Sequence, residues 1–511
     1  MLKKVYGSAV FGVEATTITV EVNVDTGIGY HLVGLPDNAI KESNYRIAAA
    51  LQNNGYKIPG KKITINMAPA DLRKEGSAYD LTLAIGILAA SKQIQAPDLE
   101  KYLIMGELSL DGGLQPIKGA LPIAIKAREE GFKGFILPIQ NAKEAAIVDG
   151  LEVYGVENIT QVIDYFDKGE SLEQTIINTR EEFAKNLNFP EFDFADVKGQ
   201  ESIKRCMEIA AAGGHNIILI GPPGAGKTML AKRLPSILPP MTLKEALETT
   251  KIHSVVGQVK DSGLMAQRPF RSPHHTISNV ALVGGGSYPQ PGEISLSHNG
   301  VLFLDELPEF KREVLEVMRQ PLEDREVTIS RAKFTVTYPS SFMLVASMNP
   351  SPSGYFNDPD SPVTSSPAEM QRYLSKISGP LLDRIDIHIE VTPVPFEKLS
   401  DERKGETSVE IRERVTKARN RQSERFKESD VVHYNAQMNT KQIRKHCKLD
   451  EASMQLLKTA MERLNLSARA YDRILKVSRT IADLEGAADI TGAHISEAIQ
   501  YRSLDREGWL G

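Results

Sequence analysis

A glycine-rich octet, GPPGAGKT at residues 221–228, has the residue types needed to hold a chain of phosphates. The apolar run at 216–220 precedes it and predicts one buried strand, and residues 229–234 follow it and predict a helix. Glycines let the backbone N–H groups turn toward phosphate oxygens, and a helix N-terminus adds partial positive charge. Strand, glycine turn and helix together give the phosphate-loop pattern G-x-x-x-x-G-K-[ST] in the context that it requires.

Two side chains of the octet have predicted roles of their own. Lys227 is placed to reach the β- and γ-phosphates of a nucleoside triphosphate, and the Thr228 hydroxyl is placed to bind Mg²⁺. The sequence therefore predicts ATP and Mg²⁺ as cofactors. The residues predicted to contact the nucleotide are Gly221, Pro222, Pro223, Gly224, Ala225, Gly226, Lys227, Thr228 and Met229.

A second apolar run, at residues 301–304, ends in the two carboxylates Asp305 and Glu306. Downstream of a phosphate loop, such a run predicts the Walker B strand of an ATPase. Asp305 would hold Mg²⁺, directly or through water, and Glu306 would polarise the attacking water as general base. The alternative is an ordinary strand end with two surface acids.

Two β-type runs, at residues 326–330 and 334–338, predict a hairpin with Arg331, Ala332 and Lys333 at its tip. Cations at a hairpin tip can contact nucleic-acid phosphates without reading the base sequence. Arg331 and Lys333 are candidate DNA contacts if the chain forms a ring whose pore these tips line, as the family resemblance described below implies.

The composition of the 511-residue chain is ordinary for a globular protein, and its net charge is −5. Overall charge therefore does not predict nucleic-acid binding, and any such contact must be local. Cys206 and Cys447 lie far apart without metal-type spacing, which indicates a reducing compartment. No apolar run reaches the roughly 18 residues of a membrane span, and the N-terminus lacks the features of a signal peptide. We expect a cytoplasmic protein without a membrane partner.

Length and pattern predict an α/β multidomain protein. Residues 1–170 form a predicted α/β domain, and residues 171–195 are charged and without periodicity, which predicts a linker. Residues 196–395 form the predicted nucleotide-binding core, and 396–511 a helical domain. In that last domain the basic run 408–427 predicts a helix whose cations face either solvent or DNA. The elements predicted in the first domain include strands at 18–24, 62–67 and 102–108 and helices at 37–51, 79–90 and 120–130.

The motifs of residues 196–395 resemble those of AAA+ ATPases. Asn349 follows an apolar run and matches sensor 1, a polar residue that orients the hydrolytic water in that family. Arg384 stands just before another strand-like run and matches the arginine finger, which reaches the γ-phosphate bound by the neighbouring subunit. An ion pair with Asp383 or Asp386 is the alternative for this arginine.

The same resemblance implies two further nucleotide contacts. Arg469, at the start of a periodic helical run at 465–486, matches the sensor 2 arginine of AAA+ lids, and Arg473, one turn later, is the second choice. The segment on the adenine side is represented by Asp196, Val197, Gly199 and Gln200.

Residues 1–170 resemble the Lon-protease-like domain of the ribosomal-protein S5 superfamily, on the segments VGLPDNAIKES and GELSLDGGLQPIKGAL. The positions of the serine nucleophile and the lysine base of that protease fall on Ala78 and Leu121. Ser77 and Lys118 lie one and three residues away, so a shifted register would restore them. We expect a proteolytically inactive domain that serves as a scaffold, an oligomer contact or a nucleic-acid contact.

Taken together, the motifs are similar to those of the magnesium-chelatase-like branch of AAA+ ATPases, and within it to the competence protein ComM (YifB) family. RPFRSPHHTIS, PGEISLSHNGVLFLDELPEF and SGPLLDRID are the most specific segments, and the insertion between the Walker motifs fits the helix-2-insert clade. The resemblance implies a hexameric ATPase that acts on single-stranded or branched DNA, with branch migration in recombination or natural transformation. The alternatives are a chelatase-type motor subunit that remodels a protein partner and, further away, an ATP-dependent Lon-like protease.

One segment departs from the family. Many members carry a cysteine cluster after sensor 1, of the form NPCPCG, which suits zinc. Here Ser351 and Ser353 stand at the first pair of positions. Serine is a poor zinc ligand, so we expect no zinc.

Overall fold

The computed structural model describes residues 1–187, 192–259, 263–286, 288–331, 334–354, 366–394, 405–429 and 431–502. The chain forms two compact units. Unit 1 contains Met1–Leu187 and Thr242–Ala266, and unit 2 contains Asn188–Met241 and Gln267–Gly511. The chain therefore passes between the units three times rather than once, because a segment that lies between the phosphate loop and the Walker B run belongs to unit 1.

Unit 1 is built on a seven-stranded mixed sheet of order β3-β4-β2-β1-β5-β8-β9. β2 is antiparallel to both β1 and β4, and the other neighbouring pairs are parallel. Alternating side chains of β2 are buried, as its sequence pattern predicts. The strands are β1 (Leu2–Phe11), β2 (Glu14–Asp25), β3 (Gly29–Val33), β4 (Lys62–Ala68), β5 (Tyr102–Ile104), β8 (Gly134–Pro138) and β9 (Glu152–Val156).

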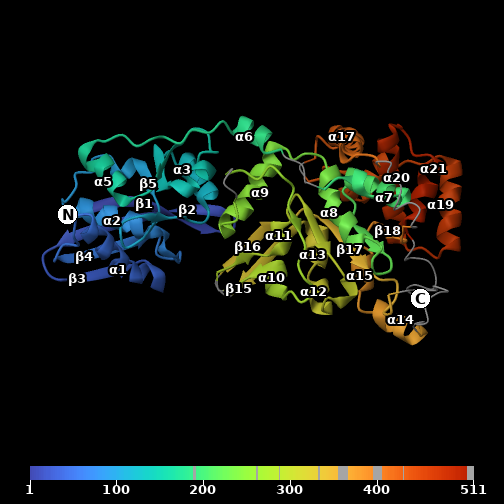
Figure 1. The fold of residues 1–511 in the computed structure, drawn as a ribbon, viewed down its shortest axis with the longest axis horizontal. Coiled ribbons are helices and arrows are strands. Elements are labelled where there is room, and N and C mark those ends of the chain that lie inside the picture. The colour runs from blue at the N-terminus through green and yellow to red at the C-terminus, as the bar shows by residue number, and fades with distance from the viewer. Residues whose placement is uncertain are drawn as a thin grey trace. The chain divides into compact units, whose positions relative to one another are not determined.

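Six helices from residues 1–187 complete this part of unit 1 (Figure 1). α2 is buried along its whole length because nearly all its residues are apolar. Its one charge, Asp80, accepts hydrogen bonds from Nε and Nη2 of Arg46 at 2.6 and 2.9 Å. The helices are α1 (Asn38–Asn53), α2 (Asp80–Ala90), α3 (Ala120–Glu129), α4 (Ile139–Ala145), α5 (Ile159–Lys168) and α6 (Thr179–Lys185).

Two details of unit 1 differ from the sequence prediction. The single strand predicted at 102–108 ends at Ile104, and Glu107–Leu108 (β6) instead pairs with Leu114–Gln115 (β7) in a small separate hairpin. The predicted linker at 171–195 contains α6, whose first turn is capped by the Asn178 side chain. The other predicted strands and helices of this domain are confirmed within a few residues at each end.

The inserted helix α9 (Leu243–Val256) packs against α3 within unit 1. A capping box between Thr242 and Glu245 fixes its start. Near its end, the Ser254 carbonyl accepts a hydrogen bond from Gly119 N at 2.9 Å, and the Ser254 hydroxyl donates to the buried carboxylate of Glu144. Burial raises the pKa of Glu144. These polar contacts fix the position of α9 on the surface formed by α3 and α4.

Unit 2 has a five-stranded parallel sheet of order β11-β14-β17-β10-β18. Every residue of β10, β14 and β17 is buried, which explains their continuous apolar runs. We call the edge where these strands end the carboxyl edge and the edge where they begin the amino edge. The strands are β10 (Ile217–Ile220), β11 (Phe270–Arg271), β14 (Val301–Leu304), β17 (Met343–Met348) and β18 (Ile387–Glu390).

The predicted cationic hairpin is confirmed as β15 (Glu326–Arg331) paired antiparallel with β16 (Phe334–Pro339). Arg331 pairs with Phe334 at the end of the ladder, and its side chain is exposed. Ala332 and Lys333 lie outside the described residues.

The C-terminal part of unit 2 is helical, as predicted. Its helices are α17 (Ser408–Arg425), α18 (Thr440–His446), α19 (Glu451–Arg463), α20 (Ala468–Glu485) and α21 (Gly492–Gln500). Several arginines of α17 bond within unit 2 and so are neither free surface cations nor a ready DNA-binding face. Arg419 donates to Ala212 O at 3.0 Å, Arg414 pairs with Glu208, and Arg425 donates to Asp483 at 2.7 Å.

Candidate nucleotide-binding site

The phosphate loop connects the carboxyl end of β10 to α8 (Lys227–Ile237). A Cβ atom at Gly221 would lie 2.2 Å from Val391 O, so only glycine fits there. Gly224 and Gly226 have φ of +80° and +89°, which favour glycine. The loop thus has the tight backbone path that turns N–H groups inward ahead of a helix N-terminus, and it fits the phosphates of ATP.

Lys227 is the first residue of α8, and its ammonium group lies inside the loop. Its Nζ donates to Gly221 O at 2.6 Å, to Pro222 O at 3.0 Å and to Asn349 Oδ1 at 3.1 Å. Burial lowers the pKa of Lys227, and Asp305 and Glu306 oppose that shift. The contact with Asn349 brings the predicted sensor 1 residue to the phosphate loop.

The end of β14 lies beside α8, because β14 is separated from β10 only by β17. The Thr228 hydroxyl donates to Asp305 Oδ2 at 2.8 Å, so the two predicted Mg²⁺ ligands are in contact. The Ser347 hydroxyl, on β17, donates to Asp305 Oδ1 and accepts from Glu306 N at 3.2 Å. A hydroxyl beside a carboxylate is an oxygen pair that suits Mg²⁺.

Glu306 is held in an uncommon conformation. Its φ is +55°, in the left-handed region that non-glycine residues seldom adopt and that is enriched at functional sites. Its carboxylate is exposed and lies 3.8 Å from Nδ1 of His275. The His275 ring lies edge-on to Phe310 and next to the ring of His274.

The structure adds residues that the sequence analysis did not assign. His275 comes from the RPFRSPHHTIS segment, which stood out in the sequence without a role, and Ser347 comes from an apolar strand. Tyr373 donates from its hydroxyl to Asn349 O at 3.2 Å. On the adenine side, Gln200 Nε2 donates to Ala225 O at 3.2 Å and to Thr392 O at 3.0 Å, so the predicted adenine-side segment reaches the loop.

Three of the residues predicted from the AAA+ resemblance, Arg384, Arg469 and Arg473, lie at the amino edge of the sheet. Arg384 precedes β18, and its carbonyl accepts from Asn216 Nδ2 at 3.0 Å just before β10 begins. Its guanidinium donates to Pro380 O at 2.6 Å and pairs with Glu323, a partner that the sequence did not suggest. Arg469 pairs with Asp383, so the structure does not bring Arg469 to the phosphate loop of its own chain.

Arg473 forms an ion pair with Asp386 at 2.9 Å and thereby joins α20 to the start of β18. Asp386 is buried and also contacts His215 Nδ1 at 3.3 Å. Burial alone would raise the pKa of Asp386, but the Arg473 guanidinium and His215 hold the pKa of this carboxyl well below its ordinary value.

We predict that Asp386→Asn lowers the free energy of unfolding of unit 2 by about 3 kcal/mol at pH 7, because it removes the buried carboxylate that pairs with the partly buried Arg473 guanidinium. A carboxyl whose pKa is lower in the folded protein than in the unfolded chain stabilises the folded state. This stabilisation is complete above the unfolded-chain pKa of about 3.9 and is lost as pH falls below it. The deficit of the variant should therefore be constant from pH 7 to about 5 and shrink below about 4. Urea unfolding at each pH measures it.

Asp383→Asn is the matched control for this prediction, because the adjacent Asp383 pairs with the exposed Arg469. Its cost should stay below about 1 kcal/mol. Equal costs for the two variants would contradict the assignment of a buried stabilising pair to Asp386.

The residues considered for proteolysis lie in unit 1. Ser77 donates from its hydroxyl to Glu107, and Lys118 packs its side chain next to Gly257 of the inserted segment. Ala78 O accepts from Gly106 N at 2.7 Å, and Leu121 N donates to Glu144. Within the described residues, no hydrogen bond joins Ser77 to Lys118, so they do not form a dyad in this conformation.

Ser351 and Ser353, at the positions of the family's first cysteine pair, hydrogen-bond to each other at 2.8 Å. Residues 355–365 lie outside the described part, so the expected absence of zinc stays a prediction. Elsewhere in the described ranges, no three His, Cys, Asp or Glu side chains are grouped to share a metal ion. None of the described helices combines the length and apolar sequence that a bilayer crossing requires.

Comparisons with known proteins match nearly the whole chain. Residues 193–399 match the family model of magnesium chelatase, subunit ChlI; residues 20–141 match subunit ChlI of Mg-chelatase; and residues 405–502 match the ChlI C-terminal region. Three family models thus cover an N-terminal ChlI domain, a core with a parallel sheet and a helical C-terminal domain.

Full-length relatives extend this match. Competence protein ComM of Haemophilus influenzae is 45% identical over 98% of this chain and 97% of its own length. Proteins named YifB from Salmonella typhimurium and Escherichia coli are each 44% identical, over 98% and 99% of this chain and 97% and 98% of their own lengths. The chain therefore belongs to the competence protein ComM (YifB) family of magnesium-chelatase ChlI-like ATPases.

Proposed function

We propose that this protein is an ATP-driven ring motor of AAA+ helix-2-insert type that acts on DNA, with ATP hydrolysed between neighbouring subunits. The placement of the candidate residues at two opposite edges of one sheet carries this proposal. Lys227, Asp305 and Asn349 lie at the carboxyl edge, whereas Arg384 lies at the amino edge. The four residues of β10 between the two edges span about 13 Å, too far for Arg384 to reach phosphates on its own loop.

In the proposed ring, one subunit binds ATP with its phosphate loop and holds Mg²⁺ with Thr228 and Asp305. ATP with Mg²⁺ supplies a phosphoanhydride bond whose hydrolysis can drive movement. Glu306 accepts a proton from the attacking water, and Asn349 keeps that water in place. The neighbouring subunit supplies Arg384.

Arg469 fits the same geometry. Arg469 lies on α20 and pairs with Asp383, which is the residue immediately before Arg384. Arg469 therefore lies at the amino edge of the sheet, the edge that would face a neighbour's nucleotide. We therefore propose that any sensor 2 contact by Arg469, or by Arg473 one turn later, is made across the subunit boundary. The proposed ring has six subunits, as in the family resemblance.

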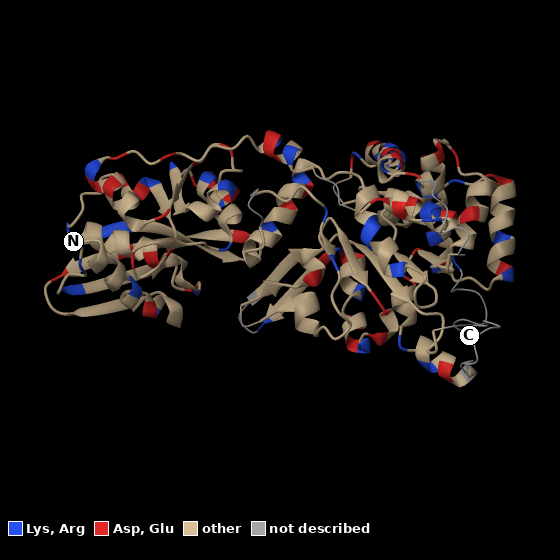
Figure 2. Ribbon diagram, viewed as in Figure 1, with Lys and Arg blue, Asp and Glu red and all other residues tan. Residues whose placement is uncertain are grey.

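DNA is the proposed polymer for two reasons. A relative at 45% identity is named a competence protein, and the β15–β16 hairpin places Arg331 at an exposed end. Basic and acidic residues are interspersed along the described elements of each unit (Figure 2), so a local contact of this kind is what the charge distribution allows. If the hairpin ends line the pore of the ring, Arg331 and Lys333 would contact phosphates of single-stranded or branched DNA.

The test of the proposal is ATP turnover and strand displacement measured with three-way and four-way DNA junctions. We expect DNA to stimulate turnover and the protein to separate the junction strands. A chelatase-type motor that remodels a protein partner would hydrolyse ATP at the same rate with and without DNA, and that result would reject the DNA proposal. Sizing of the ATP-bound assembly tests the six-subunit ring independently.

Arg331→Glu should weaken the binding of single-stranded DNA. Loss of one phosphate contact lowers the slope of log affinity against log salt by about one, and the introduced carboxylate adds repulsion. Titrating single-stranded DNA at several salt concentrations measures both effects. Arg463→Glu, on the exposed end of α19, is the matched control and should bind as wild type; identical salt slopes for all three proteins would remove Arg331 from the DNA contact.

A further inference from the structure

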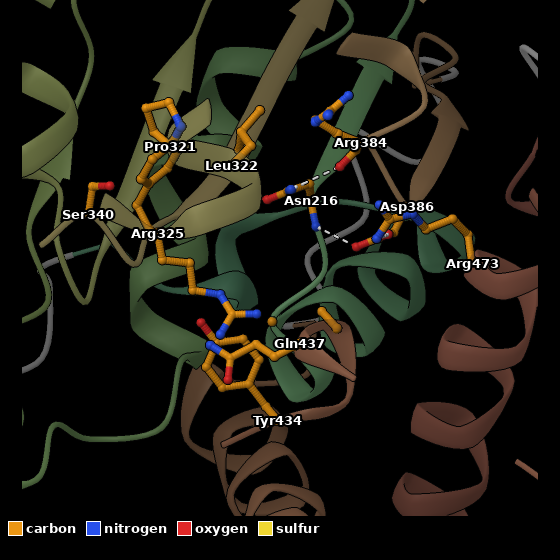
Figure 3. Close-up of a pocket in the computed structure, with 13 residues that line it drawn as sticks. Asn216, Pro321, Leu322, Arg325, Ser340, Arg384, Asp386, Tyr434, Gln437 and Arg473 are labelled. Carbon is orange, nitrogen blue, oxygen red and sulfur yellow. Dashed lines mark hydrogen bonds and ion pairs between the residues drawn. The ribbon is translucent and has the colours of Figure 1, made fainter. Parts of the chain in front are cut away.

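A small cavity of about 60 Å³ opens at the amino edge of the unit 2 sheet, away from the phosphate loop. Its volume is far below the ~300 Å³ at which pockets for whole drug-sized ligands begin, so it has room for one small group. Figure 3 shows that the base of the β15–β16 hairpin, the segment before β10, the segment before β18 and the C-terminal helical part all contribute side chains.

The cavity is rich in positive charge. Three arginines, Arg325, Arg384 and Arg473, are among its lining residues, against one acidic residue, Asp386. Arg473 is neutralised by Asp386, and Arg384 is paired with Glu323 outside the lining. Within the described residues, Arg325 has no carboxylate partner.

Arg325 is held in place by the fold and not by a counter-ion. Its φ is +59°, between α13 (Arg319–Asp324) and β15, and its Nη1 donates to Val431 O at 2.9 Å. Burial lowers the pKa of Arg325. Figure 3 shows its side chain extended toward Tyr434 and Gln437. A cation that is partly desolvated without an acid is costly, so an anion placed against it would be stabilising.

A buried hydroxyl at the cavity lacks a partner among the described residues. Ser340 is 1% exposed, and no described group bonds to its hydroxyl, while its N–H donates to Arg325 O at 2.8 Å. Arg384 Nε is also buried without a partner among the described residues, but Figure 3 shows the Arg384 side chain directed away from Arg325. Buried donors are nearly always satisfied in folded proteins, so an acceptor belongs in this cavity.

We propose that this cavity is an oxyanion site that binds a phosphate group, either free inorganic phosphate or a phosphate of a nucleotide carried by the next subunit. An uncompensated guanidinium, that of Arg325, and a buried hydroxyl, that of Ser340, are donors that phosphate oxygens accept from. The second source rests on the ring proposed above, whereas the first does not. Arg325 and Ser340 flank the base of the β15–β16 hairpin, and Arg331 lies at its other end. A phosphate bound in the cavity would therefore hold the base of this hairpin in one position.

The test is calorimetric titration of the full-length protein with inorganic phosphate in chloride buffer. Lys227→Ala is the background, so that the phosphate loop contributes as little as possible. In this background Arg325→Gln should weaken phosphate binding by about tenfold or more, since it removes a charged donor, and Ser340→Ala by about 2- to 10-fold. Arg463→Gln is the matched control and should bind as the background does.

Unchanged phosphate affinity in both Arg325→Gln and Ser340→Ala would overturn the proposal. Circular dichroism checks the folding of each variant, and Ser340→Ala, which removes only a hydroxyl, keeps the test valid if Arg325→Gln folds poorly. A non-hydrolysable ATP analogue added to assembled wild-type protein separates the two sources. If phosphate still binds at the cavity when the analogue is present, free phosphate is the occupant. If the analogue blocks phosphate binding in the assembly but not in the dilute monomer, the occupant is a phosphate of the neighbour's nucleotide.

Discussion

Arg384→Ala should reduce the rate of ATP turnover by about 10³- to 10⁵-fold while ATP binding is retained. Arg384 lies at the amino edge of the sheet, so it adds nothing to the site of its own chain but would neutralise transition-state charge at the neighbour's site. Steady-state turnover by the assembled protein, together with binding of a fluorescent ATP analogue, separates catalysis from affinity.

Mixing of variants makes this prediction specific to a neighbour. Arg384→Ala and Lys227→Ala should each be nearly inactive alone, but a mixed ring would contain boundaries at which an intact phosphate loop faces an intact Arg384. Partial recovery of turnover on mixing is therefore expected, and no recovery in a verified mixed assembly would place Arg384 outside the neighbour's site.

Glu323→Gln is the matched control for Arg384→Ala. Glu323 pairs with the Arg384 guanidinium, and this pair lowers the pKa of the Glu323 carboxyl. If Arg384 must leave Glu323 to reach a nucleotide, removal of the carboxylate charge should leave turnover at the wild-type level or raise it. A loss as large as that of Arg384→Ala would show that the pair itself is needed in the active assembly.

Glu306→Gln should bind ATP normally and hydrolyse it about 10²- to 10⁴-fold more slowly, which is the usual contribution of a general base. The amide keeps the shape of the side chain but cannot accept the proton of the attacking water. Turnover measured at saturating ATP, with nucleotide affinity measured separately, tests the prediction.

Glu309→Gln supplies the comparison for Glu306→Gln. Glu309 lies three residues later, is exposed and pairs with Lys376 at 3.3 Å, so its neutralisation should change turnover by less than about twofold. Near-normal turnover in Glu306→Gln would remove Glu306 as the base and would direct attention to its neighbour His275.

The phosphate loop, Asp305 and Asn349 could be predicted from short sequence patterns for a physical reason. Each follows an apolar run that becomes a buried parallel strand, and parallel strands place their carboxyl ends at one edge. The phosphate loop, Asp305 and Asn349 are distant in sequence but meet in the fold, because each directly follows its own buried strand. The contacts of Lys227 with Asn349 and of Thr228 with Asp305 follow from this arrangement.

The contacts of other site residues could not be predicted from the sequence, because they join distant segments and no local pattern indicates which segments meet. The Glu323–Arg384 pair joins the end of α13 to the segment before β18, 61 residues later, and the His275–Glu306 approach depends on how β11 packs beside β14. For the basic helix at 408–427, periodicity identifies a charged face but does not predict the carbonyls and carboxylates that several of its arginines contact.

The inserted segment Thr242–Ala266 bears on how the protein can be divided and on how it arose. Deleting residues 1–187 would remove α3 and α4 and leave α9 with an uncovered apolar face prone to aggregation. The points where the segment leaves and re-enters unit 2 are close together, since Arg268 Nε donates to Pro239 O at 2.7 Å. A short linker across that gap should therefore yield a self-contained nucleotide-binding unit. End-to-end fusion of two complete domains cannot by itself produce this connectivity, because the chain enters unit 1 a second time.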